Sequence, residues 1–160
     1  MKKQVSWNDY FLSIAAIVAT RSDCVSRGVG AVLVRDSSII ATGYNGSPKG
    51  IKNCSLGGCD RCKDKLLGKI PSGEQLDKCI CAHAEENTIA QAANNGISTK
   101  NSILYCTHLP CIQCSKLLIQ AGIKKILYKE DYASTLTIKY LHQAHISLKK
   151  VNKHIANLSS

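Results

Sequence analysis

The sequence contains no apolar run that approaches the length of a membrane span. It also lacks a long apolar N-terminal core followed by a small-residue cleavage site, because Asn8, Asp9 and Arg21 interrupt the first amphipathic segment. Internal repeats and low-complexity tracts are absent as well. We therefore expect neither a membrane protein nor a secreted one, and we predict a cytoplasmic location.

Acidic residues are scarce, with 11 Asp and Glu against 21 Lys and Arg, so the formal net charge is +10. A basic surface is typical of nucleic-acid partners, but it also suits a small phosphorylated substrate. The lysines are scattered along the chain, and the formal charge counts every cysteine as neutral although zinc-bound thiolates are anionic. We therefore favour a small substrate over a nucleic acid as the partner.

Hydrophobic residues make up 44% of the 160 residues, which excludes a disordered chain and predicts one domain over residues 1–160. Apolar periodicity predicts helices and strands that alternate after an initial hairpin. Such an order predicts an α/β protein, a three-layer α/β/α sandwich with a mixed sheet of about five strands. The tail from Asn152 is expected to be loose. The helices are expected at 7–20, 82–93, 111–121 and 134–144, and the strands at 29–34, 39–44, 103–107, 124–128 and 146–151.

Nine cysteines are many for this length, and they fall into C-x-x-C and C-x-C groups that favour metal over disulfides. The stretch from about 53 to 81 has no clear periodicity, and a loop of that length is usually functional or disordered. We interpret it as a cysteine-rich, zinc-binding insertion.

At least one structural zinc is predicted in a cysteine-only site of this insertion, where it would stabilise a segment that lacks a core. Six thiolates could also hold two ions by sharing ligands, and the sequence leaves this open. Cys106 lies in an apolar strand and is interpreted as a small core residue. The expected ligands are Cys54, Cys59, Cys62 and Cys81, with Cys24 and Cys79 as alternates.

A histidine and two further cysteines form a second metal-binding pattern, His83-Ala-Glu85 followed by Pro110-Cys111-Ile-Gln-Cys114. A catalytic zinc typically takes three protein ligands and leaves a position for water, and His83, Cys111 and Cys114 supply three suitable donors. Glu85 follows the histidine closely enough to carry protons for that water. Either half alone is commoner in structural sites, but the joint pattern is far more specific.

This joint pattern is the established signature of zinc-dependent nucleobase deaminases. The chain resembles the cytidine and deoxycytidylate deaminase superfamily, and within it the deoxycytidylate (dCMP) deaminases with a cysteine-rich insertion. Besides the residues above, the resemblance rests on the ranges 27–31, 43–48, 54–62, 109–114, 119–124 and 130–132.

The resemblance implies a cytidine deaminase-like fold and zinc-dependent hydrolysis of dCMP to dUMP and ammonia, which supplies dUMP for thymidylate synthesis. It implies that Asn45 contacts the nucleotide, and Asn suits this because its amide both donates and accepts. Arg27 is the candidate ligand of the phosphate. A homo-hexamer activated by dCTP with Mg²⁺ and inhibited by dTTP is also implied.

Two other functions remain open at this level. One is a deaminase of another cytosine or adenine substrate, chiefly a base in tRNA or another nucleic acid. The other is a non-catalytic zinc module that binds nucleic acid. Glu85 argues against the second, since a structural zinc site has no use for a neighbouring carboxylate that is not a ligand.

Overall fold

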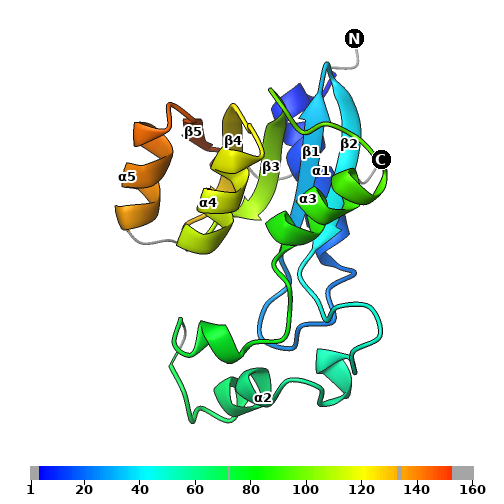
Figure 1. Cartoon of the computed structure of the whole chain (residues 1–160), viewed down its shortest axis with the longest axis vertical. Coiled ribbons are helices and arrows are strands. Elements are labelled where there is room, and N and C mark those ends of the chain that lie inside the picture. Colours follow the sequence, from blue (N-terminus) through cyan, green and yellow to red (C-terminus); the bar gives the residue numbers. More distant parts are fainter. Residues whose placement is uncertain (1–3, 72, 133–134, 153–160) are drawn as a thin grey trace.

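The computed structural model describes residues 4–71, 73–132 and 135–152 (Figure 1). The tail that was expected to be loose lies almost wholly outside these residues. None of the described helices combines the length and apolar character needed to cross a bilayer. The elements are, in order, α1 (Trp7–Ala19), β1 (Gly30–Arg35), β2 (Ser38–Tyr44), α2 (Asp60–Leu66), α3 (Ala84–Asn94), β3 (Ile103–His108), α4 (Ile112–Gln120), β4 (Lys125–Glu130), α5 (Thr135–Gln143) and β5 (Ser147–Lys150).

Five strands among the described residues form one mixed sheet in the order β2-β1-β3-β4-β5. The two antiparallel pairs are β1 with β2 and β1 with β3, whereas β3, β4 and β5 run parallel. Parallel neighbours need crossover connections, and α4 and α5 provide them. The predicted mixed sheet is therefore confirmed, and apart from α2 the elements agree with their predicted ranges to within two residues.

Local sequence explains how the first elements begin and turn. The Ser6 hydroxyl accepts a hydrogen bond from the Asp9 backbone N–H at 3.2 Å and so caps α1. The hairpin of β1 and β2 closes through Asp36 and Ser37, whose φ angles are 50° and 58°. Two successive residues with positive φ form the tight turn whose twist matches that of paired strands.

Helices cover both faces of the sheet, which confirms the three-layer architecture. Figure 1 shows α1 behind the sheet and α3, α4 and α5 in front of it. On the α1 side, Phe11, Leu12 and Ala15 pack against Val32, Tyr105 and Leu127. On the other side, Ala84, Ala92, Leu118 and Leu141 pack against Leu33, Leu104 and Ile126. Cys106 is fully buried in this second cluster, as expected of a small core residue.

Two glycines let helices approach the sheet closely from opposite sides. A Cβ at Gly30 would lie 2.1 Å from the Ala15 carbonyl oxygen of α1. A Cβ at Gly43 would lie 2.4 Å from both the Ala84 carbonyl oxygen and the Thr88 hydroxyl of α3. Backbone atoms cannot yield as the end of a flexible side chain can, so only glycine permits α3 to pack directly on β2.

Gly43→Ala is expected to destabilise the protein by about 1–3 kcal/mol, because the added methyl must push α3 away from the sheet. Urea unfolding followed by circular dichroism measures the change. Ser38→Ala, at an exposed position of the same strand, is the control and should alter the free energy of unfolding by less than about 0.5 kcal/mol. Equal stability of the two variants would contradict the close contact.

The cysteine-rich insertion extends away from the sandwich at the lower end of Figure 1. It was expected to be loop, but it contains α2 and the 3₁₀ turns Cys54–Leu56 and Leu76–Lys78. Periodicity missed α2 because its buried residues are Arg61 and Cys62. Four leucines of the insertion are exposed: Leu56, Leu66, Leu67 and Leu76. The described part of residues 53–81 therefore has no apolar core, and its buried residues other than Arg61 are Cys54, Cys59, Cys62 and Cys81.

Candidate active site

Hydrogen bonds within α3 and from the preceding residue fix the position of the start of α3. His83 is its N-cap, and the Glu86 carboxylate accepts a 2.6 Å hydrogen bond from the His83 backbone N–H. The preceding Ala82 forms a two-bond bridge with Gly46, at 2.9 and 3.1 Å. The sequence predicted His83 within the first turn of the helix. It is instead the N-cap, so its ring lies just outside the N-terminal end of α3.

The start of α4 faces the start of α3. Cys111 is the N-cap of α4, and the Cys114 backbone N–H donates to its sulfur at 3.5 Å. His83 Nδ1 lies 3.4 Å from Cys111 Sγ and 3.3 Å from Cys114 Sγ. The structure thus brings together the three donors that the sequence pattern singled out.

These donors fit a zinc ion. Usual Zn–S and Zn–N bond lengths place S and N of a tetrahedral site about 3.6 Å apart, close to the separations found here. A hydrogen bond from the Cys114 thiol lowers the pKa of Cys111 to about 4, and the same contact raises the pKa of Cys114. A divalent cation would replace the thiol protons when it binds.

Glu85 follows in the first turn of α3 and is only 4% exposed. Burial raises the pKa of its carboxyl to about 7, and the carboxyl lies beside the Cys114 thiol. A group with this pKa can both accept and release a proton near neutral pH. Its position next to the three donors suits a proton carrier.

His83, Cys111 and Glu85 line a cavity of about 670 Å³, a volume that includes solvent at the mouth. Both predicted substrate ligands, Asn45 and Arg27, line this cavity. The half-buried Arg27 guanidinium lies 5.0 Å from the centre of the Tyr132 ring, a cation–π contact that orients its charge.

The Asn45 amide is already engaged within the protein. Its Oδ1 accepts from the Val29 backbone N–H at 2.7 Å and from the Ser22 hydroxyl at 2.8 Å. Its Nδ2 donates to the Arg27 carbonyl oxygen at 2.7 Å. An amide has two N–H groups, so this bond uses half of its donor capacity. Asn45 therefore positions the loop that carries Arg27, in addition to lining the cavity.

Sequence reasoning missed several residues of the cavity wall. His108 is buried at the carboxyl end of β3, where its Nε2 lies 3.2 Å from the Glu130 carboxylate and burial lowers the pKa of its ring. Its place at a strand end was a usable signal, because ligands of α/β sheets bind there. Lys65, by contrast, comes from the insertion and donates to the Ser26 hydroxyl at 2.6 Å. No sequence pattern pointed to it.

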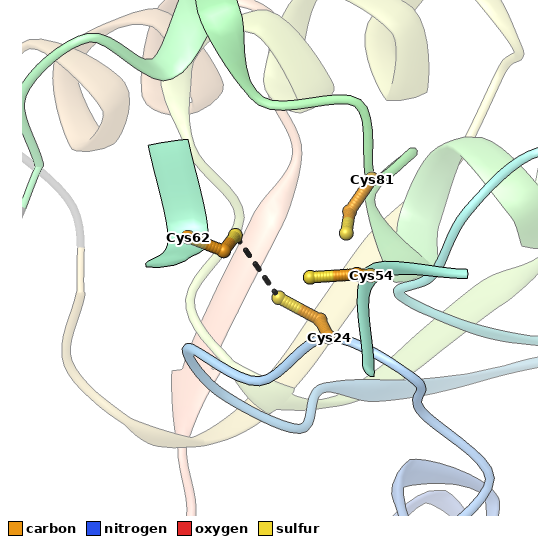
Figure 2. Close-up of side chains that lie close together, drawn as sticks. All are labelled: Cys24, Cys54, Cys62 and Cys81. Carbon is orange, nitrogen blue, oxygen red and sulfur yellow. Dashed lines mark hydrogen bonds between the residues drawn. The ribbon is translucent and has the colours of Figure 1, made fainter. Parts of the chain in front are cut away.

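The six remaining cysteines also gather, but not in the expected grouping. Figure 2 shows Cys24, Cys54, Cys62 and Cys81 around a common centre, with their sulfurs within 4.8 Å of one another. Cys24 stands where Cys59 was expected. A second group contains Cys59, Cys62 and Cys79, so Cys62 belongs to both.

One imidazole, two thiols and a buried carboxylate at facing helix ends of an α/β/α sheet are the parts of a zinc-dependent deaminase. The family model described as the cytidine and deoxycytidylate deaminase zinc-binding region matches residues 5–130. The chain belongs to this family, so zinc is its expected metal.

Three proteins similar to the chain in sequence or structure narrow the comparison within the family. It is 42% identical over 146 residues to the deoxycytidylate deaminase of Schizosaccharomyces pombe, covering 91% of this chain and 44% of that protein. ComE operon protein 2 of Bacillus subtilis is 39% identical over 150 residues, covering 93% of this chain and 73% of that protein. The crystal structure of cyanophage S-TIM5 dCMP deaminase in complex with dCMP and dUMP gives a TM-score of 0.74 at 31% identity, with 94% of this chain and 100% of that chain covered.

The likeness to the cyanophage structure confirms the expected cytidine deaminase-like fold. The chain spans less than half the length of two yeast deoxycytidylate deaminases that it matches: 44% of the Schizosaccharomyces pombe protein and 45% of the Saccharomyces cerevisiae protein.

Proposed function

We propose that the chain hydrolyses dCMP to dUMP and ammonia, with zinc at His83, Cys111 and Cys114. The observation that carries this proposal is the convergence of these donors on the buried Glu85 inside a cavity. The relatives support dCMP as the substrate, since two are deoxycytidylate deaminases and the cyanophage enzyme was crystallised with dCMP and dUMP. We expect the dUMP to supply thymidylate synthesis.

The reaction replaces the exocyclic amine of cytosine by oxygen from water and releases ammonia. Zinc, when bound, supplies an activated water at neutral pH. Glu85 accepts one proton of the water and gives it to the ring nitrogen, where it stays in dUMP. It then accepts the second proton of the same water and gives it to the amine, which departs as ammonia. Its pKa of about 7 suits both directions of transfer, because the carboxyl gains and loses a proton at little cost.

Positive charge near the cavity suits a 5′-phosphate. Arg27 and Lys65 both line the cavity, and the hydroxyl of Ser26, the residue before Arg27, accepts a hydrogen bond from Lys65. We propose Arg27 as the main phosphate ligand and Asn45 as a nucleotide contact through its remaining N–H. Remote binding energy from the phosphate would then be available to lower the barrier at the base.

A second metal site belongs to the proposal. We infer that Cys24, Cys54, Cys62 and Cys81 bind a structural zinc, so that residues 53–81 form the zinc-binding insertion of a single domain, 1–160. The four sulfurs lie within 4.8 Å of one another, and Cys54, Cys62 and Cys81 are buried. The hexamer, activation by dCTP with Mg²⁺, inhibition by dTTP and the cytoplasmic location stay predictions.

The function is tested by ammonia release from dCMP, deoxycytidine and an RNA stem-loop containing cytosine or adenine. We expect kcat/KM for dCMP to exceed that for deoxycytidine by at least about 10²-fold, since a charge-assisted phosphate contact contributes about 1.5–3 kcal/mol and more than one is available. Arg27→Ala should remove most of this preference, whereas Arg21→Ala, at an exposed position outside the cavity, should keep it. Equal kcat/KM for dCMP and deoxycytidine would contradict the nucleotide substrate, and turnover of the RNA alone would favour a nucleic-acid deaminase.

A further inference from the structure

We propose that the insertion holds two zinc ions, not one, in a binuclear thiolate cluster bridged by Cys62. This inference rests on the structural zinc proposed above and adds a second ion to it. The first ion takes Cys24, Cys54, Cys62 and Cys81, and the second takes Cys59, Cys62 and Cys79 with one position left for another ligand.

The sulfur separations agree with two adjoining tetrahedra. In a tetrahedral zinc–thiolate site, Zn–S bonds of usual length place the sulfurs about 3.8 Å apart. Cys24 Sγ lies 3.8 Å from Cys62 Sγ in the first group. In the second group, Cys79 Sγ lies 3.6 Å from Cys62 Sγ and 4.0 Å from Cys59 Sγ. Cys62 therefore lies at ligand-to-ligand distance from sulfurs of both groups, as expected of the one corner that two tetrahedra share.

The second group has the same placement at a helix start as the catalytic C-x-x-C. Cys59 is the N-cap of α2 and Cys62 lies in its first turn, just as Cys111 is the N-cap of α4 and Cys114 lies in the first turn there. In both pairs the two sulfurs project from one side of a helix start. The same spacing thus prepares two thiols for one metal at each place.

Burial indicates that the cluster replaces a hydrophobic core. Cys59 and Cys62 are no more than 1% exposed, whereas Leu56, Leu66 and Leu67 of the same insertion are at least 60% exposed. A segment that hides its thiols and exposes its leucines gains little from the hydrophobic effect. Metal binding supplies the missing free energy of folding, because each thiol releases its proton and bonds to the ion.

Other states of six clustered cysteines fit less well. A disulfide needs sulfurs about 2.05 Å apart, whereas three pairs of sulfurs in this cluster lie 3.6–4.0 Å apart, and all nine cysteines are free. A single zinc at the first group would leave Cys59 and Cys79 beside a metal-bound thiolate with no ion of their own. The buried Arg61, between Cys59 and Cys62 in sequence, has no carboxylate partner among the described residues, and its Nε and Nη2 donate to the Glu74 carbonyl oxygen at 3.2 and 2.8 Å.

The cluster also joins the insertion to the active site. Its ligands come from three separated stretches, around Cys24, from 54 to 62 and from 79 to 81. Cys24, Cys79 and Cys81 line the same cavity as His83, and Cys81 precedes His83 by two residues. Two bound ions would therefore fix the part of the cavity wall formed by Cys24, Cys79 and Cys81, which an insertion without metal would leave poorly ordered.

Zinc content of the full chain, purified under reducing conditions without added metal, tests the proposal. Elemental analysis and native mass spectrometry should give three zinc ions per chain: one catalytic and two in the cluster. Cys79→Ala should give two and Cys62→Ala one. Cys106→Ala is the matched control, since this buried cysteine belongs to neither group, and it should keep three. X-ray absorption at the zinc edge should show zinc–zinc scattering that disappears in Cys79→Ala.

Any other zinc content would contradict the proposal, and the number of ions found would show which of the proposed ions is absent. Two ions in the unaltered chain, unchanged in Cys79→Ala, would leave the single structural zinc and remove the second. One ion would remove both cluster ions. If Cys62→Ala fails to fold, the comparison of Cys79→Ala with Cys106→Ala still decides between two and three. Turnover of dCMP is measured separately, so loss of the cluster and loss of the proposed activity are distinguishable.

Discussion

Glu85→Gln is expected to lower kcat for dCMP by at least about 10²–10⁴-fold, the usual contribution of general acid–base catalysis. Glutamine has the size of glutamate and keeps a hydrogen-bonding oxygen, but it cannot carry a proton between water, ring nitrogen and amine. Because Glu85 is buried beside the metal donors and is not one of them, zinc content and fold should stay unchanged. Steady-state ammonia release and metal analysis of the same preparation measure the two effects.

The control for this variant is Glu74→Gln, which makes the same change at an exposed carboxylate of the insertion. It should keep turnover within about twofold, because its side chain lies outside the cavity wall. Turnover of Glu85→Gln close to that of Glu74→Gln would remove Glu85 from the mechanism.

Cys111→Ala is expected to lose one zinc ion per chain and to bring turnover to the background of the assay. The change removes one of three donors whose separations match a tetrahedral site, and the remaining His83 and Cys114 form too weak a pair to keep the ion. The helix α4 should persist, since its apolar face packs through Leu118. Zinc per chain, circular dichroism and ammonia release are the measurements.

Cys106→Ala again serves as the control, because it removes a buried thiol that lies in no metal group. It should keep both zinc content and turnover. An unchanged zinc content in Cys111→Ala would contradict its assignment as a ligand. Recovery of full turnover on addition of excess zinc would show instead that Cys111 only strengthens the affinity for the ion.

The candidate catalytic centre could be predicted from the sequence because each half of its signature is local. Cys111 and Cys114 lie three residues apart at a helix start, and Glu85 lies two residues from His83, so their relative positions follow from one turn of helix each. The strands were readable for the same kind of reason. β1 and β3 are buried on both faces and appear as short apolar runs, while the helices repeat their apolar residues every three or four positions.

The insertion shows where such local reasoning ends. Its helix α2 buries Arg61 and Cys62 in place of aliphatic residues, so the sequence shows no hydrophobic periodicity that would predict this helix. Lys65 reaches the cavity only because α2 folds back to Ser26, 39 residues earlier in the chain. His108 joins the cavity because β3 ends beside the starts of α3 and α4.

From the sequence alone, periodicity predicted the order of helices and strands. A recognised signature with two local halves predicted His83, Cys111 and Cys114 as zinc donors and Glu85 as the carboxylate beside them, although the two halves meet across 28 residues. Only the tertiary structure decided how the six other cysteines group into candidate metal sites. Cys24 meets Cys62 across 38 residues and Cys62 meets Cys79 across 17, and these contacts depend on how the loops pack against the end of the sheet. Spacing along the chain carries no information about such distant contacts, which is why Cys24 took the place expected for Cys59 and why the sharing of Cys62 emerged only in three dimensions.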